Sequence, residues 1–355
     1  MKTPMITRYE GGVHTDKLST RLLLPEEQPE NWKKVLADSV TDPEALLNIL
    51  NLPKTLLPGA VRGNKSFSMR IPRPYIDRMT RGDQYDPLLR QVLPLGEECE
   101  EVSGFSLDPL AEQSQNPSRG IIHKYQGRLL LITSGACAVN CRFCFRRHFP
   151  YGDNQLSGDS WTEAVEYIRS EKSIHEVILS GGDPLAATDS RLARMVDTLS
   201  DIPHVKTLRI HTRLPIVIPQ RVTGEMLQWF CGGRLKPVMV IHCNHANEID
   251  EQVEQALQKL RQAGAILLNQ TVLLKDINDD SKSLADLSQT LFNAGVLPYY
   301  LHLLDRVKGA AHFEVTDEKA RLLINELMQT CPGYLVPRLV REVAGAASKT
   351  PIPVN

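Results

Sequence analysis

The sequence lacks a surplus of charge of either sign. Its 41 Lys and Arg residues nearly balance 42 Asp and Glu residues, and the net charge is −1. A chain without a strong basic field has no long-range attraction for nucleic acid or for an anionic membrane. No apolar run approaches the length of a membrane span, and residues 1–20 lack the basic, apolar and small-residue order of a signal peptide. We therefore expect a cytoplasmic protein with a small-molecule substrate and no nucleic-acid or membrane partner.

The sequence also lacks the two CxxC-like pairs of a typical structural zinc site. Cys137, Cys141 and Cys144 lie close together, with spacings of four and three, whereas the other four cysteines form no second pair. Three local thiolates favour a soft metal or an iron–sulfur cluster. In a four-iron cluster they leave one iron open to a substrate or cofactor. We interpret the motif as a [4Fe–4S] site, with structural zinc and a redox dithiol as the alternatives.

From about residue 119, apolar runs of strand length alternate with segments of helical period. We expect strands at 129–133, 176–179, 207–210, 238–241, 266–272 and 299–303, and helices at 161–170, 191–199, 225–230, 249–263 and 283–294. Six β-then-α repeats predict an α/β fold with a parallel sheet, open or curled into part of a barrel. Residues 1–118 are expected to form a helical N-terminal region, in which Asp42 caps a helix that begins at Pro43. Residues 331–355 form a C-terminal tail.

Polar residues follow each expected strand at the same relative place. They include Cys137 to Cys144, Gly181-Gly182-Asp183, His211 to Arg213, His242 to His245, Asn269-Gln270 and Asp305. Because the carboxyl ends of parallel strands share one face of the fold, these six sets predict one site.

Lys349 stands in the tail between a run of small residues, GAAS, and Thr350-Pro351. A lysine in such a loop is usually a solvated surface residue. The alternative is a lysine that anchors pyridoxal phosphate (PLP), because a flexible loop lets the amine reach the cofactor and move away from it.

Several stretches together resemble the lysine 2,3-aminomutase family, radical S-adenosylmethionine (SAM) enzymes that also use PLP. The resemblance spans Lys124 to Pro351. It is carried by HKYQGRLLLITSGACAVNCRFCFRR, ILSGGDPL, HCNHANEID, LNQTVLLKDIND, PYYLHLLDRVKGAAHF and GYLVPRL with GAASKTP. It implies a partial (β/α)6 barrel of the radical SAM type. It also implies that a reduced cluster cleaves SAM to a radical, which starts migration of the amino group of a PLP-bound amino acid.

The resemblance also implies a role for each matching residue. Cys137, Cys141 and Cys144 would bind the cluster, and Gly181, Gly182, Asp183 and His242 would contact SAM. Lys349 would anchor PLP, with further PLP contacts from Lys124, Tyr125, Arg128 and Gln270. Arg146 would bind the substrate carboxylate, because a guanidinium suits bidentate carboxylate recognition. Asp305 and Glu342 would bind the distal ammonium of lysine.

Two positions depart from the family pattern. Glu342 stands where lysine-specific members have a second aspartate, and Lys124 stands where an arginine is usual. Both acidic residues still favour a cationic substrate, so lysine is expected and arginine is the rival. A non-catalytic iron–sulfur or zinc-binding protein is the rival from another class.

The resemblance is closest to the bacterial subgroup that makes β-lysine for modification of translation elongation factor P. It therefore implies a functional link to that factor and its lysyl ligase. It also implies an electron donor such as flavodoxin or ferredoxin, and it allows a homo-oligomer.

Overall fold

The computed structural model of the chain describes residues 31–112, 119–154, 156 and 158–354. Nine strands form one sheet in chain order from β1 to β9. Strands β2 to β8 are parallel to their neighbours, and β1 and β9 pair antiparallel at the two edges. The strands are β1 (Ile121–Tyr125), β2 (Arg128–Ser134), β3 (Glu176–Gly181), β4 (Thr207–Thr212), β5 (Lys236–His242), β6 (Ile266–Val272), β7 (Leu297–His302), β8 (Arg338–Arg341) and β9 (Thr350–Pro351).

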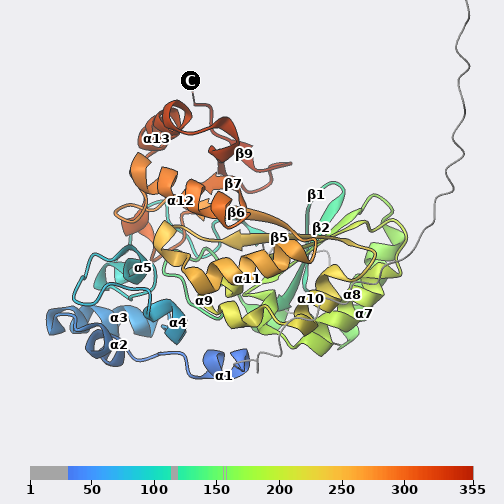
Figure 1. Ribbon diagram of the computed structural model, residues 1–355, viewed down its shortest axis with the longest axis horizontal. Helices are drawn as coiled ribbons and strands as arrows, with labels where there is room; N and C mark the ends of the chain where they lie inside the picture. The colour runs from blue at the N-terminus through green and yellow to red at the C-terminus, as the bar shows by residue number, and fades with distance from the viewer. Residues whose placement is uncertain (1–30, 113–118, 155, 157, 355) are drawn as a thin grey trace, which may run out of the picture.

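Helices follow the parallel strands and cover the outside of the sheet. Figure 1 shows α8, α10 and α11 along one side of the sheet and α12 and α13 near its C-terminal strands. The helices of this part are α6 (Tyr151–Asn154), α7 (Gly158–Ser170), α8 (Asp189–Ser200), α9 (Leu214–Val217), α10 (Gly224–Cys231), α11 (Glu251–Gln262), α12 (Ser281–Asn293) and α13 (Asp317–Thr330). The expected α/β fold is confirmed. None of the described helices is long and apolar enough to span a membrane.

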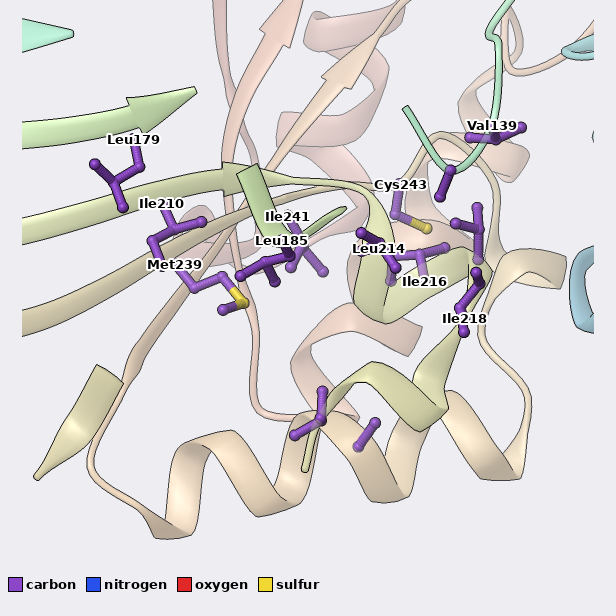
Figure 2. Close-up of a cluster of buried hydrophobic side chains, with 14 of the residues drawn as sticks. Val139, Leu179, Leu185, Ile210, Leu214, Ile216, Ile218, Met239, Ile241 and Cys243 are labelled. Atoms are coloured by element: carbon purple, nitrogen blue, oxygen red, sulfur yellow. The ribbon is translucent and has the colours of Figure 1, made fainter. Parts of the chain in front are cut away.

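Alternate residues of each strand serve two different surfaces. Leu179, Ile210 and Met239 are aligned across β3, β4 and β5, are fully buried, and lie side by side in Figure 2. Their chain neighbours Ile178 and Arg209 line a cavity on the opposite face. Because successive side chains of a strand point to opposite faces, one surface builds the core under the helices and the other builds the cavity. Strands β1 to β7 all contribute to that cavity, which fits a sheet curled into a partial barrel.

The N-terminal region is helical, as expected. It contains α1 (Trp32–Ala37), α2 (Pro43–Leu50), α3 (Leu57–Ser66), α4 (Arg73–Ile76) and α5 (Pro87–Arg90). The Asp42 side chain caps α2 by accepting from the backbone N–H of Ala45 at 3.1 Å, and Pro43 is the first helical residue. Leu46 and Leu50 are buried in the same continuous core as Leu179. These helices are therefore packed onto the barrel as part of its core. The segment 1–30 lies outside the described residues.

The C-terminal tail is built into the sheet. Strand β8 pairs with β7, and the two-residue strand β9 pairs with β8. Lys349 directly precedes β9, so the backbone of its loop is held at both ends by strand pairing. The division of the chain into three domains at residues 118 and 330 stays a prediction.

Candidate functional site

One cavity of about 290 Å³ lies inside the curled sheet, and its wall contains every residue to which the family resemblance gave a role. Each of the six strand-end sets contributes to this wall, but residues 243–245 and Asn269 of those sets do not line it. The set with assigned roles comes from strands, from the loops that follow them, and from the tail. It is Lys124, Tyr125, Arg128, Cys137, Cys141, Cys144, Arg146, Gly181, Gly182, Asp183, His242, Gln270, Asp305, Glu342 and Lys349. Residues 225 positions apart in the sequence are thus brought to a single surface, as the parallel-strand argument requires.

The loop after β2 carries Cys137, Cys141 and Cys144, and all three line the cavity. Within the described residues, no group of three His, Cys, Asp or Glu side chains is arranged around a single metal ion. Each cysteine of a [4Fe–4S] site ligates a different iron, and three thiols on one cavity wall can supply three of the four ligands. Burial raises the pKa of the Cys137 thiol, and it raises that of Cys144 to about 11. Iron would supply the positive charge that stabilises the thiolates there.

Gly181 and Gly182 allow the end of β3 to approach the cysteine loop. Gly181 has φ +123°, and a Cβ on it would lie 2.5 Å from the Ser134 carbonyl oxygen. A Cβ on Gly182 would lie 2.6 Å from the carbonyl oxygen of Ala136 and 3.0 Å from Cys137 Sγ. Glycine is required at both places because any side chain would push the loop away.

Asp183 lines the cavity, but its carboxylate is already used by the chain. It accepts hydrogen bonds from Thr212 Oγ1 at 2.7 Å and from the backbone N–H groups of Leu185, Arg213 and Leu214 at 2.8–3.1 Å. Burial raises the pKa of Asp183 to about 6, against the lowering effect of these bonds. The side chain thus joins the loops after β3 and β4.

Two buried arginines attach the cysteine loop to the N-terminal region. Glu98, in the 3-10 helix η2 (Gly96–Cys99), accepts from Arg142 Nε and Nη2 at 2.8 and 2.5 Å and from Arg147 Nη2 at 2.8 Å. All three side chains are fully buried. Arg142 also donates to the Phe67 carbonyl at 2.8 Å. One carboxylate therefore compensates two guanidinium groups and fixes the loop on both sides of Cys144.

The end of the cavity near the tail holds Lys349 beside Glu342. Lys349 Nζ donates to Glu342 Oε2 at 2.7 Å, and the Tyr125 hydroxyl donates to the other oxygen. The Lys349 side chain is only 23% exposed and lies 5.6 Å from the Tyr300 ring centre. Lys349 is therefore directed into the cavity, unlike an ordinary surface lysine. Burial raises the pKa of Asp305 to about 7, Lys349 lowers it, and Glu342 raises it.

Arg146 and Lys124 share an acidic partner that the sequence analysis missed. Glu112 receives a bidentate pair from Arg146, with Nε–Oε2 at 2.7 Å and Nη2–Oε1 at 2.9 Å, and Lys124 Nζ lies 3.3 Å from Oε1. Glu112 is 4% exposed and lines the cavity. It comes before the first strand of the sheet, so no strand-end pattern pointed to it. Among the described residues, Arg146 Nη1 contacts Ser180 Oγ and the Gly181 carbonyl, both at 3.3 Å.

Three neutral histidines also face the cavity from strand ends. His211, His242 and His302 belong to β4, β5 and β7, and none of their Nε2 atoms has a hydrogen-bond partner among the described residues. Burial lowers the pKa of His242 to about 3 and those of the other two well below the usual value. All three rings are uncharged near neutral pH and can offer a ring nitrogen to a ligand. Only His242 was given a role from the sequence, although His302 also ends a strand.

Known proteins resemble this chain over most of its length. Residues 131–220 match the model of the Radical SAM superfamily. The chain is 52% identical to L-lysine 2,3-aminomutase of Escherichia coli (strain K12) over 91% of this chain and 94% of that protein. It is 48% identical to the Haemophilus influenzae (strain ATCC 51907 / DSM 11121 / KW20 / Rd) protein of the same name, over 92% and 98% of the two chains. For the Clostridium subterminale protein of that name, the identity is 33% over 92% and 78%.

These matches cover more than nine-tenths of this chain. The residues in the cavity fit the cofactors of such proteins, because they supply three thiols, a cavity-facing lysine and a cation-rich wall in one space. The chain belongs to the L-lysine 2,3-aminomutase family, radical SAM isomerases that use a [4Fe–4S] cluster, SAM and PLP.

Proposed function

We propose that this chain is an L-lysine 2,3-aminomutase, which moves the α-amino group of L-lysine to the β-carbon. The observation that carries the proposal is the single cavity that unites Cys137, Cys141 and Cys144 with Lys349 and Asp305. When bound, the cluster and SAM supply a carbon-centred radical, and PLP supplies a conjugated ring that carries the migrating amino group. The chain's own residues bind the cofactors and the two charged ends of the substrate, and they keep water away from the radical.

At the cluster end, the three cysteines hold the iron. Gly181 and Gly182 present a side-chain-free backbone against which the amino acid part of SAM can lie. His242 offers its uncharged ring to the same ligand, and its ring centre lies 5.5 Å from that of Phe143 in the cysteine loop. Because His242 stays neutral, it can accept or donate a hydrogen bond without adding charge near the cluster.

At the PLP end, Lys349 is the anchor, and Lys124 and Arg128 provide positive charge for the phosphate. Tyr125 and Gln270 complete this wall. The Arg128 guanidinium lies 4.6 Å from the Tyr125 ring centre, which restricts both side chains. Borohydride treatment of the PLP-loaded protein should leave a pyridoxyl group on Lys349. An adduct on Lys275 or Lys308 instead would contradict this role.

The substrate is recognised at its two charged ends. Arg146 binds the carboxylate, and Asp305 and Glu342 bind the distal ammonium, because a cation that leaves water needs negative partners. Glu342 already holds the amine of Lys349 at 2.7 Å. The distal ammonium of the substrate and the amine of Lys349 are therefore alternative partners of one carboxylate. The side chain of Glu342 is one methylene longer than that of aspartate, so its carboxylate can reach toward both amines.

The test is anaerobic incubation of the reconstituted protein with lysine, SAM, PLP and dithionite, with product identified by mass spectrometry and chiral analysis. Formation of β-lysine, at a rate above that of β-arginine from arginine in parallel, supports the proposal. Arginine is the second candidate because Asp305 and Glu342 would attract its cationic group as well. Faster turnover of arginine would transfer the assignment to that substrate, and no turnover of either would defeat it.

We further propose that the enzyme works in the cytoplasm, takes its electron from a flavodoxin or ferredoxin, and supplies β-lysine to the lysyl ligase of elongation factor P. The seven cysteines are all unpaired, which suits a reducing compartment. The elongation factor link rests on the subgroup resemblance. Mass spectrometry of elongation factor P from cells with and without this chain would test it, and an unchanged modification would contradict it. A homo-oligomer is a further proposal, to be tested by light scattering.

A further inference from the structure

Arg213, directly after β4, connects the cysteine loop to a buried polar cluster. It is 6% exposed, and its Nη1 donates to Cys141 Sγ at 2.7 Å. Its Nη2 donates to Gln91 Oε1 at 2.6 Å, to Glu248 Oε2 at 2.8 Å and to the Tyr75 hydroxyl at 3.1 Å. The guanidinium is thus held on one side by three partners, and its other side is directed at a cysteine of the cavity wall.

This contact differs from the other arginine contacts of the cysteine loop. Arg142 and Arg147 donate to Glu98 and to backbone carbonyls, and these bonds stabilise the loop's conformation. Arg213 instead contacts the sulfur of Cys141 itself. A neutral thiol is a weak acceptor, whereas a guanidinium and a thiolate form a charge-assisted hydrogen bond. The geometry therefore suits Cys141 as a thiolate ligand.

The charge of Arg213 is fixed. A guanidinium is not deprotonated in proteins, and Glu248 lies 2.8 Å from its Nη2 as the counter-charge. The Arg213 Nε–H group is buried and has no hydrogen-bond partner within the described part of the chain.

We propose that Arg213 is a positioning residue that raises the reduction potential of the iron–sulfur cluster by donating a hydrogen bond to Cys141 Sγ. The inference rests on the proposed function, because it requires the cluster on Cys137, Cys141 and Cys144. On reduction the cluster accepts one electron from the reductant, no protein bond forms or breaks, and the net charge of the cluster becomes more negative by one. A fixed cation and a donor at the sulfur favour the more negative state.

The N-terminal region helps to position Arg213 through the same contacts. Tyr75 and Gln91 belong to that region, and Gln91 also donates to Glu248 Oε1 at 3.1 Å and accepts at 3.0 Å from the side-chain amide of Asn244. These neutral groups orient the guanidinium, and Glu248 supplies a carboxylate that pairs with it. The helical region therefore sets the position of a charge beside the cluster in addition to packing on the barrel.

The experiment is an electron paramagnetic resonance titration of the full-length, anaerobically reconstituted protein with dithionite and redox mediators. Arg213→Lys keeps a positive charge for Glu248, but a single ammonium cannot reproduce the fork that reaches both Glu248 and Cys141. We expect the one-electron reduction equilibrium to shift toward the oxidised cluster by about tenfold, which lowers the midpoint by about 59 mV. The matched control is Arg234→Lys, which makes the same change at an arginine whose guanidinium donates to the backbone carbonyls of Ser200, Val205 and Ile202; its midpoint should stay at the wild-type value.

The outcomes separate the inference from the proposed function. If the wild-type protein forms no four-iron cluster, the proposed function fails first. If all variants carry four irons and share one midpoint, the role of Arg213 is refuted. Should Arg213→Lys fail to fold or to bind iron, Glu248→Gln decides the question, because it removes the counter-charge of Arg213 and should raise the midpoint. An unchanged or lower midpoint in that variant overturns the inference.

Discussion

Replacing Asp305 by Asn tests how the cavity selects its substrate. Asparagine has almost the same shape but carries no charge, so the change removes one of the two carboxylates assigned to the distal ammonium. Asp305 lines the cavity, and burial raises its pKa to about 7, which shows how little water supports its charge. A cationic partner therefore stabilises the ionised form of Asp305 more than it would stabilise a carboxylate at the surface.

The size of the effect follows from the electrostatics of a partly buried pair. Two unit charges 4 Å apart interact by about 4 kcal/mol at an effective dielectric constant of about 20. Glu342 remains in the variant and retains part of the attraction, so we expect a loss of about 3 kcal/mol in transition-state binding. That loss lowers kcat/KM for lysine by about two orders of magnitude.

The assay is β-lysine formation under subsaturating lysine at pH 8, where the wild-type carboxyl group is mostly ionised. Iron content and PLP content are measured in parallel and should change little, because within the described residues no hydrogen bond or ion pair joins the Asp305 side chain to a cysteine of the loop or to Lys349, whose partner is Glu342. The matched control is Glu314→Gln, nine residues further along the chain. Glu314 accepts from Arg306 Nε at 2.7 Å in a pair that is 58% and 36% exposed. Removing such a surface charge should change kcat/KM by less than about twofold.

One result would refute the reasoning. If Asp305→Asn turns over lysine as fast as the wild type, the ammonium does not depend on this carboxylate. If arginine or another amino acid is then the better substrate, the assignment to lysine falls. Asp305 would then line the cavity without binding the distal ammonium of lysine.

Three further predictions concern the titration of Asp305 and two other buried carboxylates, Glu98 and Glu112. Because Asp305 is protonated below its pKa of about 7 and then cannot pair with an ammonium, kcat/KM for lysine should rise as pH increases through about 7, and this rise should be lost in Asp305→Asn. Glu98→Gln leaves two buried guanidinium groups without their counter-charge and should destabilise the cluster-free protein by about 3–5 kcal/mol, measured as a lower urea midpoint. The surface variant Glu101→Gln, whose partner is Lys308, is the control and should unfold at the wild-type midpoint. Equal midpoints for Glu98→Gln and the wild type would contradict the argument. Glu112→Gln removes the carboxylate that competes with the substrate carboxylate for Arg146, so KM for lysine should fall by about fivefold, which corresponds to ~1 kcal/mol. A rise in KM would show instead that Glu112 orients Arg146.

Much of the fold was readable from local patterns in the sequence. All six strands expected from apolar runs are present as β2 to β7, and the capped helix at Pro43 is α2. The short strands β1, β8 and β9 were not expected, because two to five residues carry too little periodicity. Helix α13 was also missed, although Ala320, Leu323, Ile324 and Leu327 are buried at helical spacing after a Thr316 cap. A count of that spacing would have found it.

The chemistry of the site was determined largely by the sequence itself. A cysteine motif, a Gly-Gly pair after a strand and a lysine among small residues are local signals, because each function needs particular residue types at short spacing. These signals pointed to Cys137, Cys141, Cys144, Gly181 and Gly182, whereas the family resemblance gave the roles of Lys349 and of the other residues, and all of them line one cavity.

Only the tertiary structure decided which buried charges face one another. Glu112 pairs with Arg146, Glu98 with Arg142 and Arg147, and Arg213 with Cys141, across sequence separations of 34 to 72 residues. Such pairs leave no local pattern, because an ion pair depends on distance in space and on exclusion of water, and any acidic residue in the chain could have supplied the charge. The sequence thus determined which groups the site contains, and the folding of the sheet around the cavity determined which charge stabilises which.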